Sequence, residues 1–174
     1  MKISVDAQDG EAMDPQNEHQ LLTVPGLVGK VPLLLDVAPP DAVVPSNYPK
    51  LILQWAGMPL DKWLYPLGQE EPKPSSDDLV EAYDLLEEKL KDVLGAVHSA
   101  GWLHGPISPS NILLTGDRKS TLLQTMKEAR MIICGWTQAT RCQDKRRMTG
   151  EVWHGGDTIQ EAMQVVWPSY LWPW

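Results

Sequence analysis

The sequence predicts an α+β fold, in which one long helix is accompanied by shorter helices and several short strands. Two observations lead to this prediction. A stripe of apolar residues at helical spacing runs from Leu79 to Val97. Three short apolar runs, bounded by Gly, Pro or Asn, have the length of buried strands, at 51–54, 112–114 and 131–134. With 174 residues, the chain is long enough for a single domain with a sizeable core.

Composition is that of an ordinary globular protein and argues against two classes of partner. Hydrophobic residues make up 43% of the chain and charged residues 22%. With 15 Lys and Arg against 23 Asp and Glu, the formal charge is −8, so we expect neither nucleic acid nor an anionic membrane as a partner. One basic cluster, Lys145-Arg146-Arg147 with Arg141 nearby, is interpreted as a solvated loop rather than a binding patch.

The sequence contains no signal for a membrane or for secretion. No window reaches the roughly 18 apolar residues of a membrane span, and the acidic first thirty residues lack the apolar core of a signal peptide. Cys134 and Cys142 have neither metal-site spacing nor a secretory context that would favour a disulfide. We therefore expect a soluble protein in the cytoplasm or another intracellular compartment.

The first part of the chain is expected to contain short elements only. Residues 1–16 are acidic and contain Gly and Pro, which predicts a flexible start. Residues 17–27 have a weakly helical pattern, and residues 28–37 form an extended apolar run. Repeated prolines predict a loop over 38–50, and the strand expected at 51–54 follows it.

The long helix is the most regular element that the sequence predicts. Ser75 or Ser76 is expected to cap it, Asp77 and Asp78 suit its first turn, and Gly101 is expected to end it. Its apolar residues recur at steps of three and four and define the face that should pack in the core: Leu79, Ala82, Tyr83, Leu86, Leu90, Val93, Leu94 and Val97.

Beyond the long helix, the sequence predicts a strand hairpin and an irregular tail. Between the strands at 112–114 and 131–134, residues 118–129 are an insertion that contains helix-forming residues. A short helix is expected over residues 158–166. The aromatic end, 167–174, is expected to pack onto the body rather than remain exposed.

A motif follows directly after the predicted long helix. It reads His104-Gly105-Pro106-Ile107-Ser108-Pro109-Ser110-Asn111 and continues into the apolar residues 112–114. This order resembles the catalytic loop of the protein-kinase superfamily, which reads His-Arg-Asp or His-Gly-Asp, then Leu/Ile-Lys-Pro-x-Asn and a short strand. The scaffold positions match, but Pro106 stands where the resemblance expects the catalytic Asp and Ser108 where it expects the Lys. His104 would be structural, bonding main chain to fix the loop.

The segment from Leu53 to Leu64 is similar to the kinase hinge, where a strand leaves the small lobe and enters a short helix. The resemblance implies that main-chain atoms of Gln54, Trp55 and Ala56 would bond the adenine edge, with Leu53 guarding the pocket. Taken alone, the segment also fits a plain turn from a strand into a helix.

A third segment, Gly135-Trp136-Thr137-Gln138-Ala139, is similar to the Asp-Phe/Trp-Gly-x-Ala segment of the superfamily. In this register Gly135 occupies the position of the Asp that binds magnesium, and one residue earlier Cys134 would occupy it. Neither register supplies a carboxylate, so Asn111 is the one metal-binding residue that stands at its motif position.

The resemblance, which covers roughly 17–140, implies the large helical lobe of a kinase, a short hinge and a truncated small lobe. It divides the chain into a flexible acidic N-terminus at 1–16, a remnant of the small lobe and hinge at 17–56, and a large lobe at 57–174 that is incomplete after 140. Only about fifty residues precede the hinge, too few for the first three strands of the family, and no Gly-x-Gly-x-x-Gly motif is present. Glu18 would be the vestige of the helix Glu.

Phosphoryl transfer depends on positioned charge, and most of the charged groups that it needs are missing here. We therefore predict a pseudokinase that binds a protein partner and needs no cofactor. Two alternatives stay open. One is a Ser/Thr-type kinase with displaced catalytic groups, using ATP and Mg, in which Asp84 or Asp117 replaces the lost carboxylate. The other is a truncated remnant without activity. The His-Gly start is also similar to aminoglycoside and choline phosphotransferases.

Overall fold

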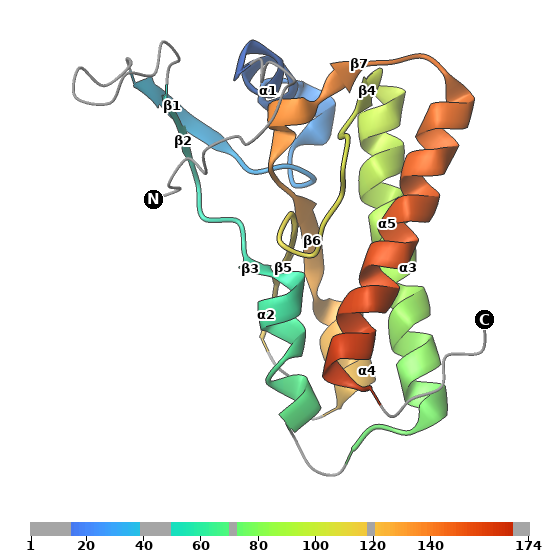
Figure 1. Cartoon of the computed structure of the whole chain (residues 1–174). Coiled ribbons are helices and arrows are strands. Elements are labelled where there is room, and N and C mark those ends of the chain that lie inside the picture. Colours follow the sequence, from blue (N-terminus) through green and yellow to red (C-terminus); the bar gives the residue numbers. More distant parts are fainter. Residues whose placement is uncertain (1–14, 39–49, 70–72, 118–120, 169–174) are drawn as a thin grey trace.

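Helices form most of the structure, and small antiparallel sheets accompany them (Figure 1). The computed structural model describes residues 15–38, 50–69, 73–117 and 121–168. Within these ranges, the predicted mixture of helices and short strands is confirmed. None of the helices in the described part of the chain combines the length and hydrophobicity needed to cross a lipid bilayer.

The helices are α1 (Pro15–Leu22), α2 (Leu60–Leu64), α3 (Ser76–Ser99), α4 (Leu122–Glu128) and α5 (Lys145–Val166), with 3-10 turns at Pro25–Leu27, Leu67–Gln69 and Trp136–Gln138. The strands are β1 (Leu34–Ala38), β2 (Lys50–Leu53), β3 (Met58–Pro59), β4 (Trp102–Leu103), β5 (Ile112–Thr115), β6 (Arg130–Ile133) and β7 (Thr140–Arg141). They form the sheets β1-β2, β3-β5-β6 and β4-β7, and all of these pairs are antiparallel.

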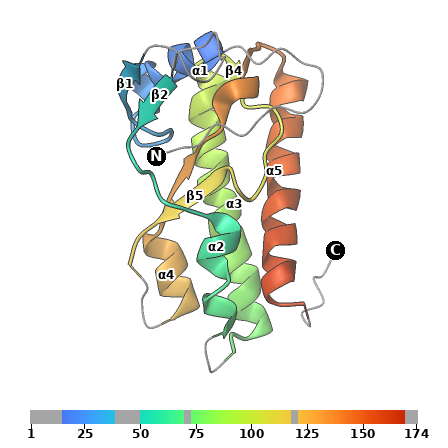
Figure 2. The same cartoon turned by 60° about the vertical axis from the view of Figure 1, so that its left-hand side comes forward.

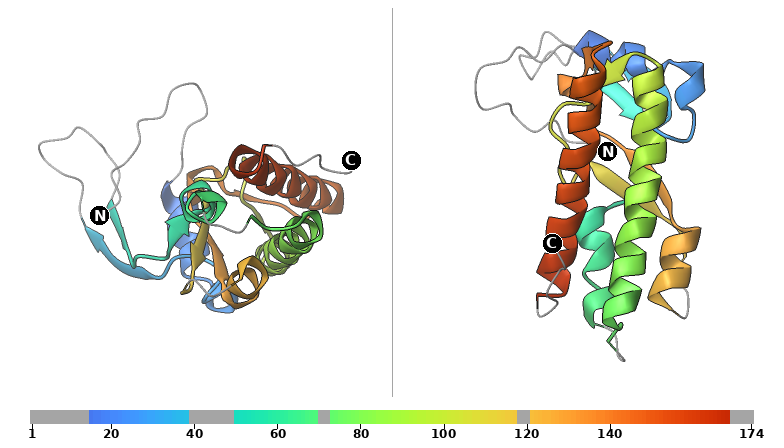
Figure 3. Two further views of the ribbon diagram at one scale, coloured as in Figure 1. Left: turned by 90° about the horizontal axis from the view of Figure 1, so that it is seen from below. Right: turned by 90° about the vertical axis from the view of Figure 1, so that its right-hand side faces the viewer.

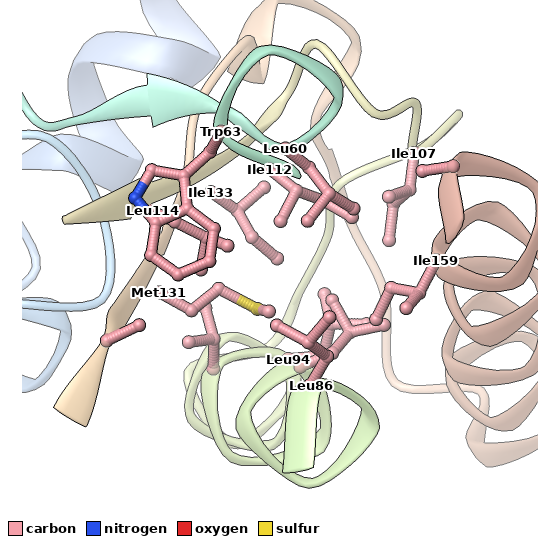
Figure 4. Packing of buried hydrophobic residues seen from close by; sticks show 14 of the residues in the cluster. Leu60, Trp63, Leu86, Leu94, Ile107, Ile112, Leu114, Met131, Ile133 and Ile159 are labelled. Atoms are coloured by element: carbon pink, nitrogen blue, oxygen red, sulfur yellow. The ribbon is translucent and has the colours of Figure 1, made fainter. Parts of the chain in front are cut away.

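The two long helices, α3 and α5, lie side by side and form the spine of the molecule (Figures 1 and 3). Figure 2 shows the sheet β3-β5-β6 together with α2 and α4 on one side of this spine. Apolar side chains from α2, α3, β5, β6 and α5 point toward one another between these layers (Figure 4). Because this core surrounds the ends of β5 and β6, it fixes the position of the segments that precede and follow these strands.

Helix α3 agrees with its prediction in detail. Ser75 is the N-cap: its Oγ accepts a hydrogen bond from Asp78 N at 3.1 Å, and Asp78 Oδ2 accepts one from Ser75 N at 3.1 Å. Hydrogen bonds from the hydroxyl and then from the amide of Ser75 lower the pKa of Asp78. Gly101 follows the helix with a φ of +79°, and the whole predicted apolar face is buried.

The prediction of a short C-terminal helix at 158–166 was wrong in its length. Helix α5 begins at Lys145 and runs for 22 residues, so the basic cluster forms its exposed first turn rather than a loop. Asp144 caps it, because its Oδ1 accepts a hydrogen bond from Arg146 N at 2.8 Å.

Glycines make the first half of α5 difficult to predict as a helix, because Gly lowers helix propensity by about 1 kcal/mol relative to Ala. Their role is steric. A Cβ at Gly155 would lie 2.6 Å from Leu90 Cδ2, and one at Gly156 would lie 3.3 Å from Tyr83 Oη. These small residues allow α5 to approach α3 closely.

The shorter elements agree with their predictions in part. Helix α1 begins at Pro15, inside the segment predicted to be flexible, and residues 1–14 lie outside the described ranges. The extended run predicted at 28–37 is a strand only from Leu34 onward. Helix α4 lies in the predicted insertion, and β2, β5 and β6 lie where strands were expected. Trp167 is buried as predicted for the tail, and residues 169–174 lie outside the described ranges.

Candidate functional site

The loop at 104–111 is tied to the segment that follows β6. His104 is 1% exposed, and its Nε2 lies 2.9 Å from the carbonyl oxygen of Cys134. Its ring packs edge-on against Trp136, with a centroid distance of 4.5 Å, and Trp136 Nε1 donates to the carbonyl of Ile133 at 2.8 Å. The His104 ring is therefore enclosed between backbone and an aromatic ring, an environment that suits a structural histidine rather than a base acting on a substrate.

Asn111 and Gly135 come into direct contact, although they are far apart in the sequence. Cys134 N donates to the carbonyl of Asn111 at 2.9 Å, and a Cβ at Gly135 would lie 2.6 Å from Asn111 Oδ1. The φ of Gly135 is +84°, a conformation that favours glycine. A larger side chain at position 135 would be strained and would collide with the amide of Asn111.

Cys134, the alternative residue predicted for the metal-binding position, directly precedes Gly135. It is partly exposed, and its Sγ lies 4.0 Å from the carbonyl oxygen of Ser110. Mg²⁺ prefers carboxylate, carbonyl and water oxygens. An amide and a thiol do not form such a site, and the described residues contain no cluster of three His, Cys, Asp or Glu side chains suited to a metal. The residues present do not fit magnesium.

The middle of the loop presents small groups and no charge. Pro106 is exposed, and Ser108 Oγ lies 2.8 Å from Ser110 Oγ. The carbonyl of Ser108 accepts a hydrogen bond from Asn111 N at 2.9 Å, and the carbonyl of Pro109 accepts one from Leu60 N at 3.1 Å. Pro106 has no side-chain donor or acceptor, so a proton of an attacking hydroxyl finds no acceptor at this position.

Glu151 of α5 also contacts the loop. Its Oε1 accepts a hydrogen bond from Gly105 N at 2.7 Å, and its Oε2 lies 2.7 Å from His98 Nε2. The side chains of Glu151 and His98 are only 6% and 11% exposed. Both carboxylate oxygens therefore have partners that fix the path of the loop.

The sequence prediction did not identify Glu151, because a helix was expected here only over residues 158–166. A signal was present: Glu151, Gly155, Thr158, Ile159 and Ala162 recur at helical spacing and are all buried. Gly155 and Gly156 made this stripe difficult to recognise, because a glycine has no apolar side chain that contributes to the periodic pattern.

The carboxylates considered as replacements lie away from the loop. Asp117 lines a hollow with Thr115, Gly116, Glu128 and Arg130, and the length of β5 separates it from Asn111. Asp84 is exposed on α3, about 20 Å along the helix from its C-terminal end, given a rise of about 1.5 Å per residue.

Burial raises the pKa of Tyr83, and the charges of Glu87, Asp157 and Asp84 add to the effect.

The predicted hinge joins β2 to β3 and is poorly enclosed. Gln54 N already donates to the carbonyl of Leu33 at 2.8 Å, and the side chain of Trp55 is 76% exposed. Leu53 and Ala56 are partly buried. After the turn, Met58 pairs with Leu114 and Pro59 with Leu113, so the hinge reaches the strand that follows Asn111.

Two hollows among the described residues lie away from the hinge, one at the β5–β6 turn and one beside the end of α3, where Ser99, Ala100, Gly101, Arg141, Cys142 and Gln143 line the second. Neither includes Asn111 or a hinge residue.

The N-terminal elements attach to the same region. Asn17 Nδ2 donates to the carbonyl of Ala139 at 3.1 Å, which places α1 against the Trp136–Gln138 turn. Glu18 is buried in α1. Lys30 forms an ion pair with Asp92 of α3, and its carbonyl accepts a hydrogen bond from Ile133 N at 3.1 Å.

Comparison with protein-family models and with curated protein sequences finds no match for this chain.

Proposed function

We propose that this chain is a kinase-like binding module that has lost phosphoryl transfer, that is, a pseudokinase. The contact between Asn111 and Gly135 carries the proposal. It brings together the two segments that resemble the catalytic loop and the metal-binding segment, and the order α3, β4, loop, β5, β6 agrees with the large lobe of a kinase. The groups at this contact are an amide, a thiol and backbone, which leaves the charged steps of the reaction without their residues.

The chemistry at this contact argues against residual catalysis. Loss of a positioned acid–base group costs roughly 10²–10⁴ in rate, and Pro106 has no atom that replaces it. Gly135 has no side chain and no space for one. What remains is a loop fixed by packing and hydrogen bonds on a helical body, and without the charged groups of the reaction such a surface suits binding of a protein partner rather than catalysis.

Nucleotide binding tests this proposal directly. We expect no magnesium-dependent rise in melting temperature when ATP is titrated into the protein, because a ligand that does not bind the folded state does not stabilise it. The matched control is Cys134→Asp, which places a carboxylate directly before Gly135 without adding a Cβ at position 135; a rise in this variant alone would identify the missing group.

The alternative of an active kinase makes the opposite prediction. A magnesium-dependent rise in the wild-type protein that disappears in Asn111→Ala would contradict the proposal. Radiolabel transfer from ATP to a generic Ser/Thr substrate or to the chain itself, lost in the same variant, would contradict it as well.

A further inference from the structure

The sheet β1-β2 lies at the periphery of the described structure (Figure 1). It extends from the helical body (Figure 3), with Leu34, Leu51 and Leu53 packed against the core, and neither strand pairs with a third strand among the described residues. Apolar side chains on and beside it remain in solvent: Leu33 is 52% exposed, Leu35 59%, Ile52 44% and Trp55 76%. Two strands alone are marginally stable in water, and a third strand or more usually completes such a sheet.

The outer edge of β1 is protected against further pairing. The register shifts between Leu34 and Asp36, so that this strand carries a bulge at Leu35. Asp36 adds a charge to the strand, and its Oδ1 accepts a hydrogen bond from Val37 N at 2.8 Å. A bulge and a charged side chain are two devices by which edge strands avoid partners.

The outer edge of β2 has no bulge, and its charged residue, Lys50, lies at the start of the strand. Gln54 N donates to the carbonyl of Leu33, so residues 54 and 52 direct their backbone groups toward β1. The N–H and C=O groups of Leu51 and Leu53 therefore point to the open side. No charged residue occurs from Leu51 to Gly57.

We propose that β2 pairs antiparallel with β2 of a second copy of this chain, about a twofold axis at Ile52. In this register Leu51 faces Leu53 of the second copy, and these are the residues whose backbone groups are directed outward. The stretch Leu51-Ile52-Leu53 has the same pattern in both directions, so apolar residues meet apolar residues without like charges facing each other.

The product is a four-stranded sheet, β1-β2-β2-β1, whose two edges are the protected ones. It joins the exposed apolar side chains of Leu33 and Ile52 from both copies on one face. The inference builds on the proposed binding role, because it names the partner. Its test contains no nucleotide, so its failure would leave the proposed loss of phosphoryl transfer untouched.

Disulfide cross-linking tests the register. Residues that face each other in a non-hydrogen-bonded antiparallel pair have Cα atoms about 4.5 Å apart, which is within the range of a disulfide. In a Cys134→Ser background of the full chain, we expect Ile52→Cys to give a covalent dimer on mild oxidation. Leu35→Cys, on the protected edge of the same sheet, is the control. Cross-linking of Ile52→Cys that is no faster than that of Leu35→Cys would overturn the proposal.

Sedimentation velocity without cross-linking supplies the second measurement. The wild-type chain should show a monomer–dimer equilibrium between about 1 and 100 μM, the range of a modest interface. Ile52→Lys places like charges opposite each other and should weaken the dimer by about fivefold or more, whereas Leu35→Lys should leave it unchanged. A monomer at every concentration, or a dimer weakened only by Leu35→Lys, would show that β2 is not the interface.

Discussion

The loop at 104–111 and the connection at 54–57 were both predicted to be parts of a kinase-like site, and the structure holds them very differently. In the loop, His104 and Ile107 are buried, Gly105 N is bonded by Glu151, and the backbone of Asn111 is bonded to Cys134. In the connection, Trp55 is exposed and Gln54 N is used within the β1-β2 sheet.

The difference indicates which of the predicted site residues the fold itself requires. His104, Gly105 and Asn111 each bond another part of the chain. Pro106, at the position where the catalytic Asp was expected, is exposed. Packing is therefore sufficient to retain the scaffold of the loop, and catalysis is not needed to explain it. Stability measurements on the two segments test this view.

Two tryptophans give the largest expected contrast. Trp102, which leads into the loop, is fully buried with the Arg141 guanidinium 3.9 Å from its ring, whereas Trp55 is 76% exposed. We expect Trp102→Ala to lower the free energy of unfolding by about 3–5 kcal/mol, and Trp55→Ala to change it by about 0.5 kcal/mol or less. Urea unfolding at low protein concentration, followed by circular dichroism, measures both. Equal losses would show that the connection is held as firmly as the loop.

Glu151→Ala should have the next largest effect. It removes the acceptor for Gly105 N and leaves His98 without its buried partner, which we expect to cost about 3 kcal/mol. Glu161, exposed on the same helix, is the matched control, and Glu161→Ala should change stability by about 0.5 kcal/mol or less. If the two variants unfold at the same urea concentration, α5 does not hold the loop.

Gly135→Ala and Gly150→Ala should have effects of opposite sign. At Gly135 the φ of +84° and the contact with Asn111 predict a loss of about 1–2 kcal/mol or more. Gly150 lies within α5 with no atom near its missing Cβ, so Ala should stabilise the helix by about 0.5–1 kcal/mol. Thermal unfolding of the two variants gives the signs, and a gain in Gly135→Ala would mean that the loop and the segment after β6 are not in contact.

The sequence was a good guide where one periodic signal decides the structure. In α3 the cap at Ser75, the apolar stripe and Gly101 agree, so the helix and its buried face were predicted correctly. In α5 the packing surface consists partly of Gly155 and Gly156, which do not contribute to a pattern of apolar side chains. More than half of this helix was therefore not predicted.

The candidate site was predictable only through the resemblance. No local pattern indicates that Asn111 lies beside Gly135, because β5 and β6 must first pair to bring these residues together. The role of Glu151 could not be predicted for a related reason. It depends on the packing of α5 against α3, which is a contact between distant parts of the chain.

The smallest expected effect concerns the far end of the helix that leads to the loop. The N–H and hydroxyl of Ser75 lower the pKa of Asp78, so this carboxylate stabilises the folded state above its ordinary pKa and loses the effect as the pH falls through its lowered value. Ser75→Ala removes the hydroxyl, the larger cause, and should destabilise the protein at neutral pH by the ordinary cost of a lost N-cap, about 1 kcal/mol. The variant should also lose less stability than the wild type between about pH 5 and pH 2, whereas Ser76→Ala should keep the wild-type profile. Urea unfolding across this range measures the difference, and parallel profiles for all three proteins would show that the cap does not couple to the pH.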